Sequence, residues 1–310
     1  MKYYDLNPHC AMASFTKYPK SSRFPTLTLF LVRHAESQNN AVNAKYASLA
    51  WEKFLRSSDP DLSEVGNQQI AKLKSYFATS SSETTQHLRA AAANGGDRFL
   101  FFSSPMRRAL KTSSALAAGL QYKNVIVDPN LFEEGGCFHD FPDMSDMKGL
   151  EHLQHMSQSE LDALKTSGQQ PTTYPGLSEA DVRDATKLSD SLGVTPETAS
   201  FVGDVMPGME NGWYAEFDQR ETRQGCYQRA KTFVDKVRGI AMNDAADDIV
   251  LVSHGDLMDA VLKNFIASGA SAIASAGDQT LDHSVRFAHT NTGITRVEVG
   301  KADGMAHISL

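Results

Sequence analysis

The clearest feature of the hydrophobic pattern is a pair of short apolar runs, each of which ends at a histidine. Residues 27–32 read LTLFLV and are followed at once by Arg33 and His34. A second run, residues 248–252, leads through one serine into His254. Continuous apolar runs of this length are typical of strands buried on both faces of a parallel sheet. Because open α/β sheets bind ligands beyond the carboxyl ends of their strands, we expect both histidines to be functional.

Strand and helix patterns alternate through the rest of the amino-terminal half. Apolar runs predict strands at 98–102 and 125–127, and helix-like spacing of apolar residues predicts three helices. These helices cover 39–55, 69–77 with Ser63 as an N-cap, and 105–119 with Pro105 in the first position. The Ser-, Thr- and Ala-rich stretch 79–96 predicts a mobile connection or a frayed helix end. The alternation favours a doubly wound α/β core.

The carboxyl-terminal half resumes this pattern after a long irregular segment. Two helices are predicted at 225–241 and 256–266, and closing strands at 285–289, 294–299 and 306–310. Residues 137–225 are rich in glycine and proline, with weak helical patterns at 151–164 and 178–192. We interpret this segment as a lid inserted into one domain that covers 25–310 and follows a flexible tail, 1–24. The predicted fold is a three-layer α/β/α sandwich with a mostly parallel central sheet.

Composition narrows the class of protein. The chain has 310 residues, of which 41% are hydrophobic and 22% charged, as is typical of a globular protein with a sizeable core. The net charge of −7 argues against a nucleic-acid partner. The three cysteines are widely spaced and predict neither a disulfide framework nor a zinc site. No apolar run reaches membrane-spanning length and the first residues do not resemble a secretory signal, so we expect a cytoplasmic protein without a membrane partner.

Several motifs, taken in order, resemble those of the histidine phosphatase superfamily, also called the phosphoglycerate mutase-like proteins. Its signature is matched by R-H-A-E-S at 33–37, with alanine where the family usually has glycine. Further matches are Asp59 with 62–66, S-S-P-M-R-R-A at 103–109 followed by Thr112, L-F-E at 131–133, S-H-G at 253–255 and N-T-G-I at 291–294. The order and number of these motifs make the resemblance specific. It implies a phosphoglycerate mutase-like fold and phosphoryl-transfer chemistry.

The resemblance also implies a role for each matching residue. His34 would attack phosphorus through one ring nitrogen while a backbone carbonyl holds the other N–H. Glu133 would be the general acid and then the general base, and His254, best if protonated, would stabilise the transferring group. Binding of the phosphate oxygens is assigned to four further residues, Arg33, Arg108, Asn40 and Ser37. We expect no metal and no other cofactor.

Some positions remain open from the sequence. Arg107 adjoins Arg108 and Glu134 adjoins Glu133; the motif spacing favours Arg108 and Glu133. Ser37 and Ser104 suit helix caps about as well as phosphate donors. A group of histidines and aspartates in the insertion has no recognised metal-ligand spacing, and a polar surface is the better interpretation. Its members are His139, Asp140, Asp143, Asp146, His152 and His155.

Three functions are compatible with these residues. The leading hypothesis is a phosphatase that hydrolyses phosphomonoesters through a phosphohistidine intermediate, acting on a small phosphorylated substrate or a phosphoprotein. A phosphoglycerate mutase is the runner-up, but Asn39 stands where the classical mutases carry tryptophan, and Glu134-Gly135-Gly136 replaces their R-H-Y after the acid. A non-catalytic module that binds phosphorylated ligands is the third. The chain carries no distinctive seam for self-association, although a homo-oligomer is compatible with the sequence.

Overall fold

The structure is a computed structural model, and it describes most of the chain in several stretches. These are residues 25–46, 56–94, 98–137, 175–184, 186, 188–189, 202–217, 219–269 and 286–309. The predicted tail at 1–24 and the predicted helix at 151–164 lie outside them, as do the histidines and aspartates of the insertion named above.

A single seven-stranded sheet forms the centre of the molecule, in the order β4-β3-β2-β5-β1-β6-β7. The strands from β4 to β1 in this order run parallel, and β6 and β7 close the sheet as antiparallel neighbours. Their bounds are β1 Thr26–Arg33, β2 Phe99–Ser103, β3 Val125–Val127, β4 Val202–Val205, β5 Asp248–Ser253, β6 Ile294–Gly300 and β7 Ala306–Ser309. The sheet is therefore mostly parallel, as predicted.

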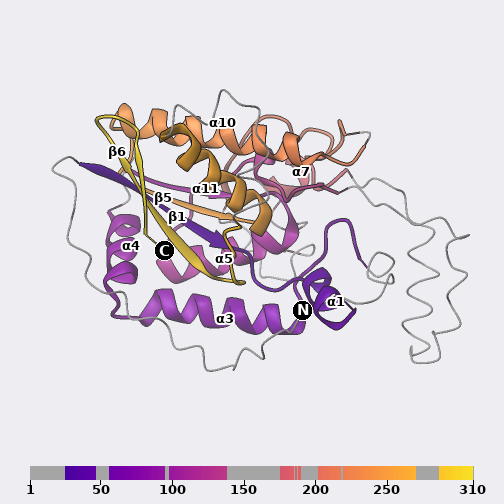
Figure 1. The fold of residues 1–310 in the computed structure, drawn as a ribbon. Helices are drawn as coiled ribbons and strands as arrows, with labels where there is room; N and C mark the ends of the chain where they lie inside the picture. The colour runs from indigo at the N-terminus through magenta and orange to yellow at the C-terminus, as the bar shows by residue number, and fades with distance from the viewer. Residues whose placement is uncertain are drawn as a thin grey trace, which may run out of the picture.

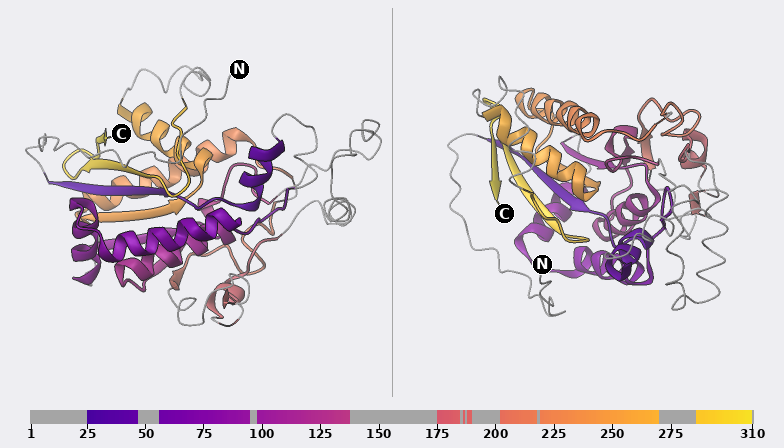
Figure 2. Two further views of the ribbon diagram at one scale, coloured as in Figure 1. Left: turned by 90° about the horizontal axis from the view of Figure 1, so that it is seen from below. Right: turned by 45° about the vertical axis from the view of Figure 1, so that its right-hand side comes forward.

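Helices cover both faces of this sheet, so that the molecule has three layers (Figures 1 and 2). Helices α3, α4 and α5 lie on one face, and α10 and α11 lie on the other. Their bounds are α3 Glu64–Thr79, α4 Glu83–Ala93, α5 Arg107–Leu120, α10 Arg223–Met242 and α11 Gly255–Gly269. Shorter elements are α1 Gln38–Tyr46, η1 Pro129–Leu131 and α7 Glu179–Arg183. The predicted three-layer α/β/α sandwich is confirmed.

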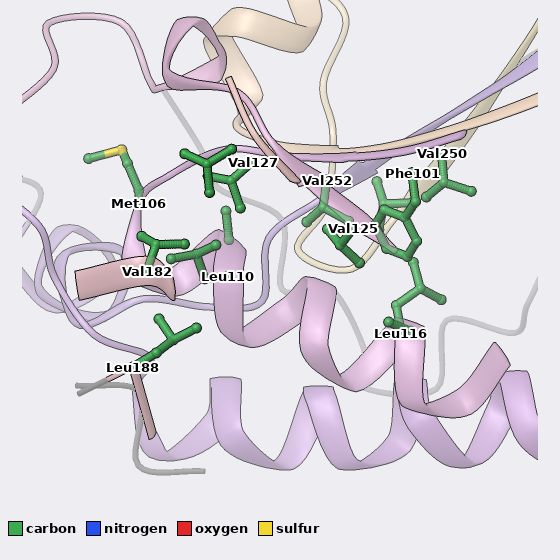
Figure 3. Close-up of a cluster of buried hydrophobic side chains, with 14 of the residues drawn as sticks. Phe101, Met106, Leu110, Leu116, Val125, Val127, Val182, Leu188, Val250 and Val252 are labelled. Atoms are coloured by element: carbon green, nitrogen blue, oxygen red, sulfur yellow. The ribbon is translucent and has the colours of Figure 1, made fainter. Parts of the chain in front are cut away.

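The alternation of side chains along each strand divides the core into two clusters. In β1, Phe30 and Val32 belong to the cluster on the α3–α5 face, while Leu27, Leu29 and Leu31 belong to the cluster under α10 and α11. Figure 3 shows side chains of α5 against those of the central strands in the first cluster. Each strand is thus buried on both faces, which explains why its sequence reads as a continuous apolar run.

The stretch 79–96 contains a regular helix rather than a mobile connection or a frayed end, so that prediction was wrong. Helix α4 (Glu83–Ala93) begins after Ser82, whose side chain accepts a hydrogen bond from the Thr85 N–H. Leu88 and Ala92 are buried against the core. A good N-cap and burial of one alanine-rich face are enough to stabilise it.

Two other helix predictions need correction. Pro105 precedes helix α5 instead of occupying its first position, because Met106 is the N-cap and the helix begins at Arg107. The helix expected at 178–192 is interrupted, since α7 ends at Arg183 and Asp184 has an extended backbone, while the described residues 186, 188 and 189 are helical again. A capping box between Ser178 and Asp181 stabilises this short helix from its amino-terminal end.

The strand expected at 285–289 is absent from the described residues 286–289, which form an irregular segment. The Phe287 N–H donates to Asp259 Oδ1 at 2.9 Å and Arg286 pairs with Asp256 at 2.6 Å. This segment is therefore anchored to helix α11 and not to the sheet, which leaves its backbone free to approach the carboxyl end of β1.

Part of the predicted insertion belongs to the central fold. Residues 202–205 form the edge strand β4, which pairs with β3. Trp213 and Tyr214 are buried, and their rings lie 5.1 Å and 5.5 Å from that of Phe132. Residues 138–174 and 190–201 of the insertion lie outside the described residues. Among the helices that are described, none has both the length and the apolar character needed to cross a membrane.

Candidate active site

The register of strands β1 and β5 brings the two histidines together. Arg33 at the end of β1 pairs with Ser253 at the end of β5, so His34 and His254 follow at the same level. The His34 N–H donates to the Ser253 carbonyl at 2.9 Å. The two imidazole rings lie 5.0 Å apart between centroids, at an interplanar angle of 54°. Two residues that are 220 positions apart in the sequence thus lie side by side beyond the carboxyl ends of neighbouring strands.

The tautomer of His34 follows from its hydrogen bonds. Nδ1 lies 2.6 Å from the Ala35 carbonyl oxygen, which can only accept, so Nδ1 carries the ring proton. Nε2 then has a free electron pair and accepts a 3.3 Å hydrogen bond from Arg108 Nε. Burial lowers the pKa of His34 well below its ordinary value, and Arg108 lowers it further. The ring is therefore a neutral base with its lone pair directed toward an arginine.

Arg108 comes from the first turn of α5 and is 6% exposed. Asp59 holds this turn, because its Oδ1 accepts the Arg107 N–H at 3.0 Å and lies 3.9 Å from Arg108 Nη1. The side chain of Arg107 lies 3.8 Å from the same carboxylate. Burial raises the pKa of Asp59 to about 6 despite these two arginines. Between the two adjacent arginines, the geometry selects Arg108 as the one beside His34.

His254 is fully buried, and Ser104 holds its ring. Ser104 Oγ lies 2.7 Å from His254 Nε2 and also accepts the Met106 N–H at 3.3 Å. A hydroxyl has one proton and two lone pairs, so Ser104 can bond either tautomer of the neutral ring. Burial, with Arg108, lowers the pKa of His254 well below its ordinary value. Burial and the nearby arginines thus favour the neutral ring in the ligand-free protein. The prediction that His254 acts best when protonated concerns the ligand-bound state and stays a prediction.

Glu133 completes the group from the loop after η1. A ring nitrogen of His34, a ring nitrogen of His254 and a carboxylate oxygen of Glu133 all lie within 4.8 Å of one another. Burial raises the pKa of Glu133 to about 7, and the neighbouring Asp256 contributes to the same shift. Glu134 instead accepts a 3.0 Å hydrogen bond from Arg223. Of the two adjacent glutamates, the geometry selects Glu133 as the one that faces the histidines.

Two glycines after the acid allow the chain to turn away from the site. Gly135 and Gly136 have φ angles of 84° and 62°, a region that side-chain-bearing residues rarely adopt. A Cβ atom on Gly136 would lie 2.0 Å from the ring of Tyr214, whose hydroxyl donates to the Gly135 carbonyl. The E-G-G sequence after Glu133 is thus explained by a tight turn packed under an aromatic ring.

Arg33 and Asn40 come from the end of β1 and from helix α1. Arg33 Nη1 donates to the His289 carbonyl at 2.6 Å, and a Cβ on Gly255 would lie 3.5 Å from Arg33 Nε, so the guanidinium reaches the end of β5. Asn40 Oδ1 accepts hydrogen bonds from Ser37 N at 3.1 Å and Asn291 Nδ2 at 3.4 Å. With its oxygen so engaged, the amide of Asn40 presents Nδ2 as the free donor.

Ser37 acts as a cap within this group. Its Oγ accepts the Asn40 N–H at 3.2 Å at the start of α1, and the residue is 2% exposed. This geometry is that of a helix N-cap, one of the two interpretations that the sequence left open. Ser104, the other serine in question, contacts His254 as described above.

Sequence reasoning gave no role to three motif residues that hold the site together. Asn291 Nδ2 donates to the His34 carbonyl at 2.9 Å, and Thr112 Oγ1 accepts the Ala35 N–H at 3.0 Å. Asp59 holds the first turn of α5. Each of them lies in a motif that resembled the family's, so the signal was present, but its meaning depends on which backbone groups the fold brings near.

Two buried donors at this site, Arg33 Nε and Arg108 Nη1, have no hydrogen-bond acceptor among the described residues. The buried ring nitrogen Nδ1 of His254 has no hydrogen-bond partner there either. Buried polar groups are nearly always paired in native proteins. Unpaired donors beyond the carboxyl ends of the strands therefore indicate a ligand rich in hydrogen-bond acceptors. His34, Glu133 and His254 also have a spacing that could hold a metal ion. The two guanidinium groups beside them favour an oxyanion over a divalent cation.

Comparisons with known proteins bear on the family. A sequence model of the histidine phosphatase superfamily (branch 1) matches residues 29–184, half of the chain. No curated protein matches the sequence.

A comparison with solved structures finds similarity to two phosphatases and a phosphoglycerate mutase. The ecdysone phosphate phosphatase of the silkworm is 14% identical, with a TM-score of 0.48 and coverage of 92% of each chain. The phosphoglycerate mutase of Bacillus anthracis is 14% identical, with a TM-score of 0.45 and the same coverage. A mycobacterial glucosyl-3-phosphoglycerate phosphatase is 15% identical, with a TM-score of 0.43 and coverage of 92% of this chain and 98% of that one.

The family model spans the strand that ends at His34, the arginine-bearing turn of α5 and the loop of Glu133. The assignment of the chain to a family rests on the length of this match and not on the similarity to solved structures. The chain belongs to the histidine phosphatase superfamily, branch 1.

Proposed function

We propose that this protein is a phosphatase that hydrolyses phosphomonoesters through a phosphohistidine on His34. In the first step His34 Nε2 attacks phosphorus, the bond from phosphorus to the ester oxygen breaks, and Glu133 gives its proton to that oxygen. In the second step Glu133 takes a proton from water as the water oxygen attacks phosphorus. The N–P bond then breaks, which restores His34 and releases inorganic phosphate.

The observation that carries the proposal is the state of His34. Its proton is fixed on Nδ1 by the Ala35 carbonyl, so Nε2 holds a lone pair 3.3 Å from Arg108 Nε. A neutral imidazole is nucleophilic, whereas a protonated one is not. The arginine beside it would bind the phosphoryl oxygens and bring phosphorus within reach of Nε2.

The electrostatic setting supports the remaining roles. A pKa of about 7 allows Glu133 to give a proton in one step and accept one in the next near neutral pH. Arg33, Arg108 and Asn40 would bind the equatorial oxygens, whose charge grows during phosphoryl transfer. A bound phosphate dianion would raise the pKa of His254 above its low value in the ligand-free protein, so a second cation would form where charge develops.

Release of inorganic phosphate from a panel of substrates tests the proposal. The panel includes sugar phosphates, small organic esters and phosphopeptides, because both small phosphorylated substrates and phosphoproteins fit the site chemistry. His34→Ala is the blank, and an acid-labile, base-stable phosphoryl adduct on His34 is expected after rapid quenching. Hydrolysis that His34→Ala leaves unchanged would overturn the proposal.

A mutase would use the same phosphohistidine but return the phosphoryl group to the substrate. Asn39 bonds the backbone of Ser57, through Nδ2 to the carbonyl at 2.8 Å and through Oδ1 from the N–H at 2.9 Å. Asn39 therefore anchors the loop of Ser57 and does not provide the apolar surface that a tryptophan would provide at this position. Supplying 3-phosphoglycerate with catalytic 2,3-bisphosphoglycerate should therefore yield inorganic phosphate and little 2-phosphoglycerate. Binding of phosphate esters without release of phosphate would instead indicate a non-catalytic module.

A further inference from the structure

The loop that carries Glu133 is held from outside by a buried arginine of helix α10. The side chain of Arg229 is 9% exposed, and that of its partner Glu221 is 6% exposed. Two parallel hydrogen bonds join them, Nε to Oε1 at 2.8 Å and Nη2 to Oε2 at 2.6 Å. This bidentate pair fixes the plane of the guanidinium group, which a lysine could not do.

The remaining edge of the guanidinium group binds the backbone just before Glu133. Arg229 Nη1 donates to the Asn130 carbonyl at 2.7 Å and to the Phe132 carbonyl at 2.9 Å. Its Cζ atom also lies 3.5 Å from the centroid of the Phe132 ring. One side chain therefore fixes the two carbonyl groups that bracket Leu131 and the ring next to the acid.

Other elements hold the neighbouring carbonyl groups. Ser253 Oγ donates to the Leu131 carbonyl at 2.9 Å, and the Tyr214 hydroxyl donates to the Gly135 carbonyl at 3.1 Å. Ser253 directly precedes His254, so the loop is tied to the strand end that bears the second histidine. Arg229 supplies the contact closest to Glu133 on its amino-terminal side, at the Phe132 carbonyl.

The carboxylate of Glu133 depends on this backbone for its position. Within the described residues, its one hydrogen bond is local, from the Glu134 N–H to Oε1 at 3.0 Å. The charges of Arg108 and Arg33 act on it, but no described arginine or lysine lies within ion-pair distance of the carboxylate. A general acid must lie within hydrogen-bond reach of the leaving oxygen, and a displacement of about 1 Å can reduce a rate about 100-fold.

We propose that Arg229, held by Glu221, is a positioning residue that sets the place of Glu133 for proton transfer to the leaving group. The inference rests on the proposed function, because it assumes that Glu133 is the general acid. It assigns Arg229 no contact with substrate. A merely structural arginine would stabilise the fold without affecting one proton transfer more than the rest of the reaction.

Dependence on the leaving group separates these two roles. p-Nitrophenolate leaves without a proton, whereas the alkoxide of glycerol 2-phosphate requires one. We compare kcat/KM for the two esters in the wild type, Arg229→Lys, Arg229→Met and Glu133→Gln. We expect Arg229→Met to lower kcat/KM at least about 30-fold for glycerol 2-phosphate and no more than about threefold for p-nitrophenyl phosphate. Glu133→Gln should show the same selectivity more strongly. Arg229→Lys should show the same selectivity, because lysine keeps the charge but cannot form the two parallel hydrogen bonds of the guanidinium group.

Arg238 provides a matched control on the same helix. It donates to the Gly304 and Phe265 carbonyls at 3.2 Å and 3.3 Å, and its Cζ lies 5.4 Å from the Phe265 ring centroid. It thus makes the same kinds of contact away from the Glu133 loop. Arg238→Met should affect both esters equally.

The outcomes distinguish this inference from the proposed function. An equal loss on both esters in the Arg229 variants, or the same selectivity in Arg238→Met, would overturn the positioning role. If His34→Ala still hydrolyses p-nitrophenyl phosphate, the proposed function itself fails. If Arg229→Met does not fold, Arg229→Lys and Glu221→Gln decide by the same comparison.

Discussion

Ser104 Oγ lies 2.7 Å from Nε2 of His254, across two neighbouring strands of the sheet. Ser104→Ala would leave a buried ring nitrogen without its partner and remove the hydrogen bond that holds the ring. We expect the free energy of unfolding to fall by about 1–3 kcal/mol and kcat to fall about tenfold. Urea denaturation and steady-state kinetics measure the two effects. An unchanged kcat would contradict the role given to this hydrogen bond.

Ser114 on helix α5 is the control for that variant. It is also a buried serine, 2% exposed, but its hydroxyl has no hydrogen-bond partner among the described residues. Ser114→Ala removes an unpaired polar group from the interior, so its stability should be unchanged or slightly higher. Its kcat should equal that of the wild type.

The pH dependence of the reaction should report the titration of Glu133. Because the first step requires the protonated carboxyl, kcat/KM for an alkyl phosphate should fall as the pH rises through about 7. Glu133→Gln should lose this limb and about 100-fold or more in kcat/KM. Titration of the substrate phosphate is removed by comparing the two enzymes on the same ester. A limb that persists in Glu133→Gln would belong to another group.

The central fold and the candidate residues could be predicted because their signals are local. The run that ends at His34 and the one that ends at His254 each describe a strand buried on both faces, and parallel strands bring their carboxyl ends to one edge. That a backbone carbonyl holds the second ring N–H of His34 was expected from the resemblance, and Ala35 supplies that carbonyl. The clamp of Arg229 could not be predicted, since it depends on carbonyl groups that only the folded chain brings near. Likewise, the neutral state of His254 is a consequence of burial, which motif spacing does not encode.

Tertiary packing also decided the elements that were predicted wrongly. Alanine-rich residues in 79–96 form a helix because Leu88 and Ala92 find a core to cover. Residues 286–289 leave the sheet because Asp259 on α11 binds the backbone N–H of Phe287. In each case a long-range contact outweighs a local preference.

Gly66 on helix α3 should be intolerant of any side chain. A Cβ there would lie 2.0 Å from the carbonyl oxygen of Glu36, in the loop that follows His34. Because both groups are backbone, neither can move without displacing an element, and Gly66→Ala should lower the free energy of unfolding by about 3 kcal/mol or more. Gly239→Ala on α10, where the added methyl meets nothing within 4 Å, should raise it by about 0.5–1 kcal/mol. Urea denaturation of both variants checks the contrast in sign.

His87 makes part of the stability dependent on pH. Its Nε2 lies 2.8 Å from Asp248 Oδ1 at the start of β5, and this hydrogen bond raises the pKa of His87 above its ordinary value. The folded protein therefore holds the proton more tightly than the unfolded chain does. The resulting stabilisation is fully present below the unfolded pKa of about 6.5 and is lost as the pH rises through the higher folded value.

The size of this effect is limited by solvent, since the side chain of His87 is 53% exposed. We expect the wild type to exceed His87→Gln by no more than about 1 kcal/mol at about pH 6, with the excess falling to near zero at about pH 8.5. Urea denaturation at both values measures it, and the difference between the two proteins cancels all other titrating groups. Because the pair lies at the opposite end of β5 from His254, kcat should be the same in both proteins. An excess that grows with pH would show that the ring is neutral in the folded state and that Asp248 does not hold its proton. A change in kcat would show that the pair affects the active site as well as stability.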